Sequence, residues 1–275
     1  MAVVKLNPIR KIKSFVRKAI NMVFHKLGYT RIMTSKSRAG QMDTERLAKN
    51  EFAKISFSQQ GEDLILERLL QQAISMDIDT HDGFYIDVGA YHPHSHSTTY
   101  LLYERGWRGI AIDMSEATCS LYRKIRPRDI VVNAAATDRE GTMTGYFANE
   151  ISLRNTIEAD GLADWVDYSE KEVPVRRLDN ILAEHPEVQE IDYLNIDAEG
   201  AEISVMDGLD LAKWRPKVIS IEIHGRDIPE AIQSDIAQYL LERDYVLMGS
   251  AVITYLFVDA RALKRVGTGP KAKVN

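Results

Sequence analysis

The sequence predicts an α/β protein whose core is an open, mostly parallel β-sheet with helices on both faces. Short apolar runs rich in β-branched residues alternate along the chain with segments of helical spacing. One of these runs, 217–224, is almost continuously apolar, as a parallel strand in the centre of a sheet requires. A glycine turn follows one strand and an acidic residue ends the next, which predicts a ligand site at one edge of the sheet.

Seven strands are expected in the main sheet, each from a short run of apolar or β-branched residues. They are 84–86, 107–112, 130–136, 191–196, 217–224, 245–248 and 253–258. The expected helices begin at capping residues or end at glycine or proline. They are 44–54, a helix after Ser58, a segment that ends at Gly106, 116–125, 178–184 and 229–243.

Two segments between the third and fourth strands do not fit the alternation of strands and helices. Residues 142–147 alternate between polar and apolar and predict an extra edge strand beside a hairpin. Residues 148–172 are polar and break the pattern, and a loop of this length is usually functional or disordered. Because Trp165 and Tyr168 can stack on sugar rings, we expect an acceptor-binding lid here, with disorder as the alternative.

The stretch from Gly83 to Asp113 carries the most information about function. Its first strand stops at Asp87–Ala90, where a carboxylate and a glycine occur together. Ligands bind at the carboxyl ends of strands in an open α/β sheet, and a glycine there lets a ligand approach the backbone. The second strand ends at Asp113, whose carboxylate can accept hydrogen bonds from ribose hydroxyls. The stretch therefore predicts a nucleoside-binding βαβ unit, with a purely structural βαβ unit as the alternative.

The glycine turn also distinguishes between cofactors. A dinucleotide site needs three glycines in the pattern G-x-G-x-x-G to wrap a pyrophosphate. Here Gly89 is followed by Ala90, Tyr91, His92 and Pro93, so the second and third glycines are missing. The turn favours S-adenosylmethionine, which has no phosphate, over a nicotinamide cofactor. A nicotinamide-dependent oxidoreductase is therefore the less favoured alternative.

The same stretch resembles the core of the FkbM family of S-adenosylmethionine-dependent methyltransferases. Three further motifs occur in the family's order, and the resemblance extends from about residue 56 to about residue 260. They are Ser58–Asp63 (SQQGED), Arg126–Asp129 (RPRD) and Asp192–Glu202 (DYLNIDAEGAE). The resemblance implies the class I methyltransferase fold, which is a Rossmann-like, seven-stranded, mostly parallel sheet with helices on both faces.

A cofactor site can be assigned from these residues and from the resemblance together. The chain departs from the family at Thr98, where an asparagine is usual, and at Met114, where a proline is usual. We expect Met114 to pack on the adenine, and the small residues that end the third strand to leave room for this ring. The expected cofactor contacts are Asp87, Val88, Gly89, Ala90, His92, Thr98, Thr99, Asp113, Met114, Ala135 and Asp197.

Acidic residues and one histidine converge at the ends of two neighbouring strands, beside the expected methyl group. Asp197, Glu199 and His224 are the candidate catalytic residues, and Glu222 lies close to them in the strand pattern. Methyl transfer to oxygen needs an aligned hydroxyl that loses its proton to a base, or to solvent when a metal acidifies it. A histidine base is slightly favoured, Mg²⁺ or Mn²⁺ stays open, and helix capping or ion pairing is the structural alternative.

Three histidines occur at alternate positions in the segment after the glycine turn: His92, His94 and His96. Alternating histidines can bind a metal, but Pro93 constrains the segment and no acid or cysteine lies nearby in sequence. The pattern is more typical of a pocket wall or of a loop that faces water.

Composition and charge divide the chain into three parts. Residues 1–38 hold ten Lys or Arg and no acid, whereas the remainder holds 25 basic and 40 acidic residues, which argues against a nucleic-acid partner. The single cysteine, Cys119, suits a reducing compartment and hence the cytoplasm. The expected parts are a basic amphipathic helix and linker at 1–40, a methyltransferase domain at 41–262 and a disordered tail at 263–275.

The basic helix has two interpretations. Within residues 8–27 an apolar stripe lies opposite basic residues, and such a helix can bind an anionic membrane surface, here the inner face of the membrane. The same helix can instead dock on the domain or on a second subunit of a homodimer.

The sequence and the resemblance together predict an O-methyltransferase that uses S-adenosylmethionine. The resemblance implies a hydroxyl of a sugar or glycan, or of a related small molecule, as the acceptor. The alternative from another functional class is a non-catalytic partner in glycan assembly that keeps the fold and binds the cofactor without turnover.

Overall fold

A computed structural model describes residues 54–160, 162–225 and 227–264. From Ser56 onward these residues belong to one compact unit. The predicted helix at 8–27, the linker that follows it and all but two residues of the predicted tail lie outside the described residues, as does the expected helix at 44–54 apart from Lys54. No helix in the described part of the chain is long and apolar enough to cross a membrane.

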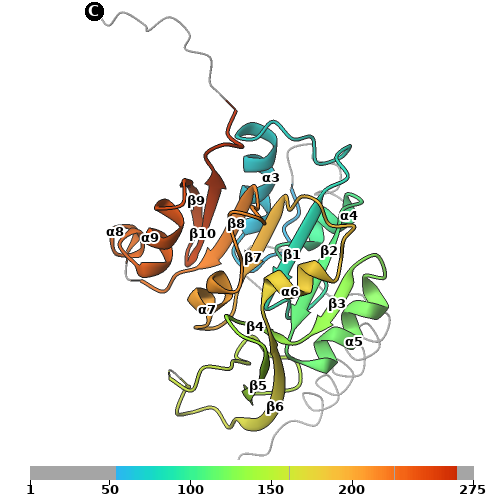
Figure 1. The fold of residues 1–275 in the computed structure, drawn as a ribbon, viewed down its shortest axis with the longest axis vertical. Coiled ribbons are helices and arrows are strands. Elements are labelled where there is room, and N and C mark those ends of the chain that lie inside the picture. The colour runs from blue at the N-terminus through green and yellow to red at the C-terminus, as the bar shows by residue number, and fades with distance from the viewer. Residues whose placement is uncertain (1–53, 161, 226, 265–275) are drawn as a thin grey trace, which may run out of the picture. The chain divides into compact units, whose positions relative to one another are not determined.

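The main sheet has seven strands in the spatial order β3–β2–β1–β7–β8–β10–β9 (Figure 1). The first five pair in parallel, and β10 is antiparallel to both β8 and β9. The strands are β1 (Phe84–Val88), β2 (Arg108–Asp113), β3 (Ile130–Asn133), β7 (Tyr193–Ile196), β8 (Val218–Glu222), β9 (Tyr245–Ala251) and β10 (Thr254–Asp259). The predicted α/β class and the mostly parallel sheet are confirmed.

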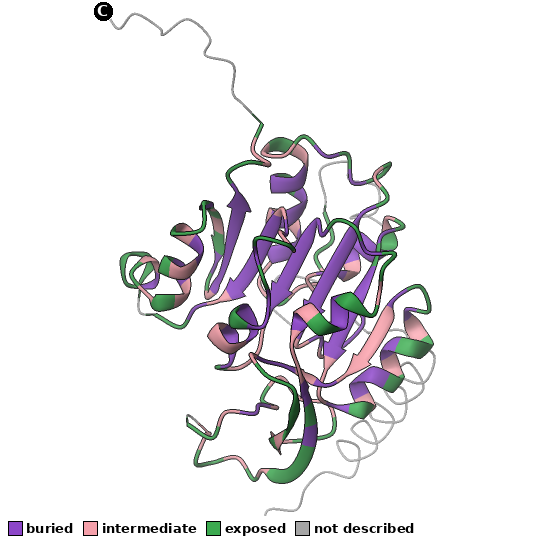
Figure 2. Ribbon diagram, viewed as in Figure 1, coloured by how far each residue is buried: buried purple, intermediate pink, exposed green. Residues whose placement is uncertain are grey.

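Helices cover both faces of the sheet because successive side chains of its buried strands point to opposite sides. Ile86 and Val88 pack with side chains of α6 (Leu178–Ala183), α7 (Glu202–Asp207) and α9 (Asp235–Leu241). Between them in sequence, Tyr85 packs on the other face with side chains of α3 (Glu62–Gln72) and α4 (Tyr100–Glu104). On this second face Tyr122 of α5 (Glu116–Ile125) packs against Ala111 of β2. The strands in the centre are buried along their whole length (Figure 2).

A second sheet of three strands lies below the carboxyl ends of β1, β2 and β3 in the view of Figure 1. It consists of β4 (Ala135–Ala136), β6 (Ser169–Arg176) and β5 (Gly141–Phe147), in that spatial order. One prediction was wrong here, because the strand predicted at 130–136 is divided between the two sheets. The extra edge strand predicted at 142–147 is confirmed as β5, which pairs antiparallel with β6 at the edge of this second sheet.

The strand divides where β2 ends at Asp113. The carbonyl oxygen of Asp113 accepts hydrogen bonds from the backbone N–H of Ala134 and from the side-chain amide of Asn133, at 3.1 and 3.0 Å. The chain turns away from β2 at this point and pairs with β6. The helix predicted at 229–243 is likewise two helices, α8 (Ile228–Ile232) and α9, because Ser234 caps a new helix by accepting from the N–H of Ala237.

Gly89 occupies a position that no other residue can take without moving the backbone. It follows β1 with φ +73°, in the left-handed region that favours glycine. A Cβ atom added there would lie 1.7 Å from the carbonyl oxygen of Asp197, which follows the neighbouring strand β7. The glycine is therefore required for the close approach of the two strand ends, whatever ligand binds beside them.

We predict that Gly89→Ala lowers the free energy of unfolding by more than left-handed strain alone can explain. Strain costs about 1–2 kcal/mol, and the overlap with Asp197 should add roughly 1–3 kcal/mol. Gly106→Ala is the matched control, because Gly106 has φ +95° and open space around it. Urea denaturation measures both variants, and equal losses of stability would show that the approach to Asp197 is not a constraint.

Candidate functional site

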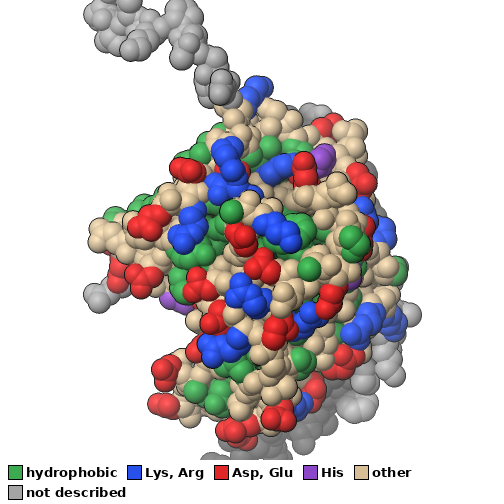
Figure 3. All heavy atoms as spheres, in the orientation of Figure 1, with side chains coloured by type: hydrophobic (Ala, Val, Ile, Leu, Met, Phe, Trp, Pro, Cys, Tyr) green, Lys and Arg blue, Asp and Glu red, His purple; other side chains and the backbone are tan. Residues whose placement is uncertain are grey.

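Two cavities lie at the carboxyl ends of β1, β2, β7 and β8. The first encloses about 580 Å³ of space and the second about 410 Å³, including in each case the part open to solvent. Both are lined by Gly89 and Asp197, so the turn after β1 and the end of β7 form a shared wall. In Figure 3 the outline of the molecule is indented between the main sheet and the part that carries β5 and β6. The position of the two cavities matches the rule that ligands of α/β sheets bind at the carboxyl ends of the parallel strands.

The first cavity combines an apolar wall with the carboxylate of Asp113, and Asp197 and Glu199 line it as well. Asp113 accepts hydrogen bonds from the backbone N–H groups of Tyr91 and Ser115, at 2.9 and 2.7 Å, one on each oxygen. Burial raises the pKa of Asp113 to about 6, so near neutral pH it is mostly ionised and can accept further hydrogen bonds. The apolar wall includes Met114, Ala135, Leu153 and Ile157. A flat apolar ring with hydroxyl groups attached would fit this arrangement.

The segment after β5 forms part of this first cavity. Its lining residues are Ser152, Leu153, Asn155, Thr156 and Ile157. Thr156 pairs with Tyr146 through the backbone, and its hydroxyl donates to the carbonyl oxygen of Glu199 at 2.9 Å. The sequence predicted an acceptor lid or disorder in 148–172, and it gave no signal that residues 152–157 contribute to the wall of a cofactor-sized cavity.

The second cavity is polar. Its lining includes the carboxylates of Glu62, Asp87, Asp197 and Glu222 and the uncharged polar side chains of Gln59, Ser97, Thr98, Asn195 and Thr254. Asp87 accepts from the hydroxyl of Thr99 at 2.6 Å and from the side-chain amide of Asn195 at 2.9 Å. Thr98 Oγ1, close to the Tyr193 hydroxyl, makes no hydrogen bond of normal geometry with the described residues. Carboxylates with few nearby cations would suit a ligand that carries positive charge.

Three carboxylates meet beside the shared wall. Burial and the charge of Glu222 raise the pKa of Asp197 well above its ordinary value, and the same two causes raise the pKa of Glu199 to about 7. Burial also raises the pKa of Glu222. The turn that carries Glu199 has left-handed φ values of +49° at Glu199 and +105° at Gly200, and Glu202 accepts from the Gly200 N–H. A carboxylate with a pKa near 7 can act as a general base at neutral pH.

The predicted cofactor contacts fall into three groups. The first cavity is lined by Val88, Gly89, Asp113, Met114, Ala135 and Asp197, and the second by Asp87, Gly89, Ala90, Thr98 and Asp197. Thr99 and His92 line neither cavity. Thr99 is completely buried behind Asp87, and His92 is buried with its Nδ1 accepting from the backbone N–H groups of His94 and Ser95.

The candidate catalytic residues also separate. Asp197 and Glu199 both line the first cavity, whereas His224 lines neither cavity. The His224 side chain is 64% exposed, with its Nε2 atom 3.7 Å from Glu222 Oε2. The strand β8 ends at Glu222, so strand alternation no longer places His224. Among the described residues, no group of three or more His, Cys, Asp or Glu side chains is arranged to hold a metal ion.

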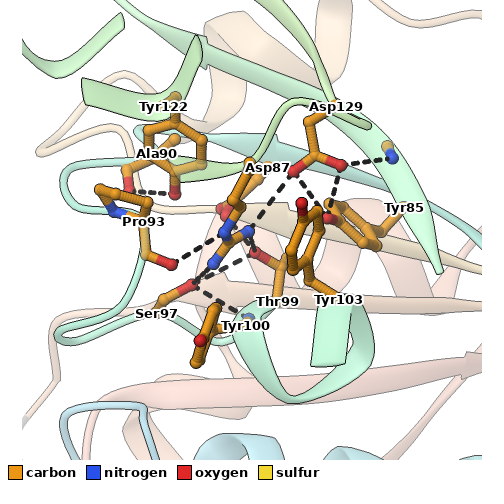
Figure 4. Close-up of polar contacts among 12 residues, drawn as sticks. Tyr85, Asp87, Ala90, Pro93, Ser97, Thr99, Tyr100, Tyr103, Tyr122 and Asp129 are labelled. Carbon is orange, nitrogen blue, oxygen red and sulfur yellow. Dashed lines mark hydrogen bonds and ion pairs between the residues drawn. The ribbon is translucent and has the colours of Figure 1, made fainter. Parts of the chain in front are cut away.

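A buried arginine binds the segment that follows the glycine turn, and no role was predicted for it from the sequence. Arg126 follows α5, is fully buried, and donates to the carbonyl oxygen of Pro93 and to the hydroxyls of Ser97 and Thr99, at 2.8, 2.7 and 2.8 Å. Figure 4 shows these acceptors with Asp87 and Asp129. Asp129 lies 3.6 Å from the guanidinium and accepts from the Tyr85 hydroxyl. The RPRD motif was the available signal, because it places an arginine three residues before an aspartate.

The fold and the cavities define an α/β protein with two adjoining cavities at the ends of its parallel strands. A comparison with known families finds that residues 87–247 match the Methyltransferase FkbM domain. Because the match covers more than half of the 275 residues, the chain belongs to the FkbM methyltransferase family, and the predicted resemblance is confirmed. Membership supports methyltransferase activity. A search of curated proteins returned no match.

The pKa of Glu199 leads to a prediction about stability. Its value of about 7 exceeds the ordinary 4.5, so the folded protein holds this proton more tightly than the unfolded chain does. The resulting stability is complete below pH 4.5 and is lost as pH rises through about 7. We expect Glu199→Gln to reduce the loss of unfolding free energy between pH 5 and pH 8, measured by urea denaturation.

Glu170→Gln on exposed β6 serves as the control and should retain the wild-type pH dependence. An equally steep loss of stability in Glu199→Gln and the wild type would contradict the prediction.

Proposed function

We propose that this protein is an S-adenosylmethionine-dependent O-methyltransferase that acts on a hydroxyl of a sugar, a glycan or a related small molecule. The observation that supports it best is the pair of cavities that meet at Gly89 and Asp197. The first cavity has an apolar wall beside Asp113, and the second is polar and is lined by four carboxylates, with Asp197 common to both. S-adenosylmethionine has the same division, with an adenosine at one end, a charged amino acid at the other and a sulfonium between them.

The residues of the two cavities suit these parts of the cofactor. Asp113 would accept hydrogen bonds from the ribose hydroxyls, while Met114 and Ala135 would pack on the adenine. Asp87, Asn195 and Thr98 would face the amino-acid end. When bound, the cofactor supplies a methyl group activated by attachment to a positively charged sulfur. The protein must then align the acceptor oxygen with this group and remove its proton.

Glu199 is our first choice for the base. It is partly buried at the mouth of the first cavity, and its pKa of about 7 matches the range in which a base is both available and effective. Asp197 would lie beside the reacting group, where a cationic cofactor would favour its ionised form and so lower its raised pKa. The exposed His224 beside Glu222 is the alternative base, and Mg²⁺ or Mn²⁺ bound with the acceptor is the alternative to any base.

The sugar acceptor is supported by an exposed aromatic side chain near these carboxylates. Trp165, on the segment between β5 and β6, is 74% exposed, and the Arg154 guanidinium lies 4.5 Å from the centre of its ring. The charge of Arg154 also lowers the pKa of Glu199, so Arg154 is close to the proposed base as well as to the aromatic ring. An exposed indole can pack on the apolar face of a sugar ring while polar neighbours bind its hydroxyls.

The proposal is tested by binding and by transfer. Calorimetry should show that the wild type binds S-adenosylmethionine and that Asp113→Ala weakens binding by about 1.5–3 kcal/mol, the worth of charge-assisted hydrogen bonds. Glu116→Ala, at the exposed start of α5, is the control. Isotope-labelled methyl groups should appear on sugars from a panel of glycan acceptors. Absence of cofactor binding contradicts the proposal, and binding without transfer to any acceptor supports the non-catalytic partner.

A second experiment identifies the group that removes the proton. We expect Glu199→Gln to lower kcat by about 10²–10⁴-fold without changing cofactor affinity, and the wild-type rate to rise with pH through about 7. Single-turnover rates with and without a chelator make the measurement. A comparable loss in His224→Ala but not in Glu199→Gln would transfer the role to His224. Loss of turnover with the chelator, restored by Mg²⁺ or Mn²⁺, would show a metal instead.

A further inference from the structure

The buried Arg126 lies outside both cavities, yet it contacts the segment that lines one of them. Its three hydrogen bonds go to Pro93, Ser97 and Thr99, all between β1 and α4. Ser97 and its neighbour Thr98 line the second cavity. The Arg126 guanidinium also lies 4.9 Å from the ring centre of Tyr122, whose hydroxyl donates to the carbonyl oxygen of Ala90 in the glycine turn.

The direction of the hydrogen bonds follows from the chemistry of arginine, which can only donate. Thr99 Oγ1 accepts from Arg126, so its own hydrogen is available for Asp87 Oδ2, at 2.6 Å. The other oxygen of Asp87 accepts from Asn195. Both donors act on Asp87 from the protein side, which leaves its remaining lone pairs for a group in the second cavity.

We propose that Arg126 is a positioning residue for the ligand's ammonium group, and that it acts through Thr99 to keep Asp87 ionised and correctly oriented at the second cavity. The inference rests on the proposed function, because the ammonium belongs to the amino-acid end of S-adenosylmethionine. Arg126 touches no ligand itself. Through Thr99 it holds Asp87, which accepts from the ligand, and it also binds Ser97 in the segment beside the second cavity.

The charges around Asp87 show why such support is needed. Burial raises the pKa of Asp87, while the hydrogen bonds from Thr99 and Asn195 and the charge of Arg126 lower it. Several other acids oppose its ionisation or lie in the same cavity. The titratable groups that face Asp87 or share its cavity are Arg126, Tyr122, Tyr193, His96, Asp113, Asp129, Asp197, Glu62 and Glu222. Loss of the hydrogen bonds from Arg126 to Thr99 and from Thr99 to Asp87 should therefore raise the pKa of Asp87.

The test measures the binding of S-adenosylhomocysteine, which has the same ammonium group and no methyl to transfer. Thr99→Val removes the hydroxyl with little change in volume. Arg126→Lys keeps the positive charge but cannot donate to the hydroxyls of Ser97 and Thr99 at the same time with the geometry of a guanidinium. Calorimetry from pH 5.5 to pH 8.5 gives the affinity of each variant relative to the wild type. We expect Thr99→Val to bind roughly tenfold more weakly at pH 6, the worth of one hydrogen bond to a charged group, with the deficit shrinking as pH rises. Arg126→Lys should follow the same trend.

Asp129→Asn is the matched control, because Asp129 is equally buried on the other side of Arg126 and lines neither cavity. It should destabilise the protein without producing a deficit that grows at low pH. If Thr99→Val and Asp129→Asn both show pH-independent ratios to the wild type, Arg126 only supports the fold and the inference is wrong. If the wild type itself fails to bind S-adenosylhomocysteine, the proposed function is overturned and the inference with it.

Discussion

The close approach of the turn after β1 to the end of β7 is the constraint on which the site depends. The parallel pairing of the two strands brings Val88 beside Ile196, and the next residues must then pass each other without side chains between them. Gly89 meets this requirement with a positive φ and with the Asp197 carbonyl in the place of its missing Cβ. As a result, acids that are distant in sequence, at the ends of β1, β2 and β7, face two cavities with a common wall.

The buried acids around this wall are compensated unevenly. Asp87 and Asp129 have Arg126 beside them, and hydrogen bonds from Thr99, Asn195 and Tyr85 satisfy their oxygens. At the other end, burial and the charge of Glu222 raise the pKa values of Asp197 and Glu199, and burial raises the pKa of Glu222. Clusters of carboxylates with raised pKa values that face a cavity are common at functional sites, because a bound cation compensates their negative charge. Hydrogen bonds and the charge of Arg126 thus stabilise the acids on one side of the turn, whereas the three acids on the other side are less well compensated.

Local patterns predicted most of the main sheet, since apolar runs and glycine turns are short-range signals. They did not predict that 130–136 divides at Ala134, because that division depends on pairing with β6, about forty residues further along the chain. The carboxylate cluster could be predicted from strand order, but the exposure of His224 depends on where β8 stops. The role of Arg126 could not be predicted, because arginines are mostly exposed and only the folded chain shows four partners around this one.

The second sheet contributes to the site because it begins beside the first cavity. Its short strand β4 continues directly from the turn at Ala134, and Ala134 to Ala136 line the first cavity. The antiparallel pair β5 and β6 then holds the segment whose Thr156 bonds to the carbonyl oxygen of Glu199. The same small sheet therefore contributes to the wall of the cofactor-sized cavity and fixes the backbone that carries the proposed base. Under the proposed function, cofactor binding and proton removal would therefore depend on this one structural element.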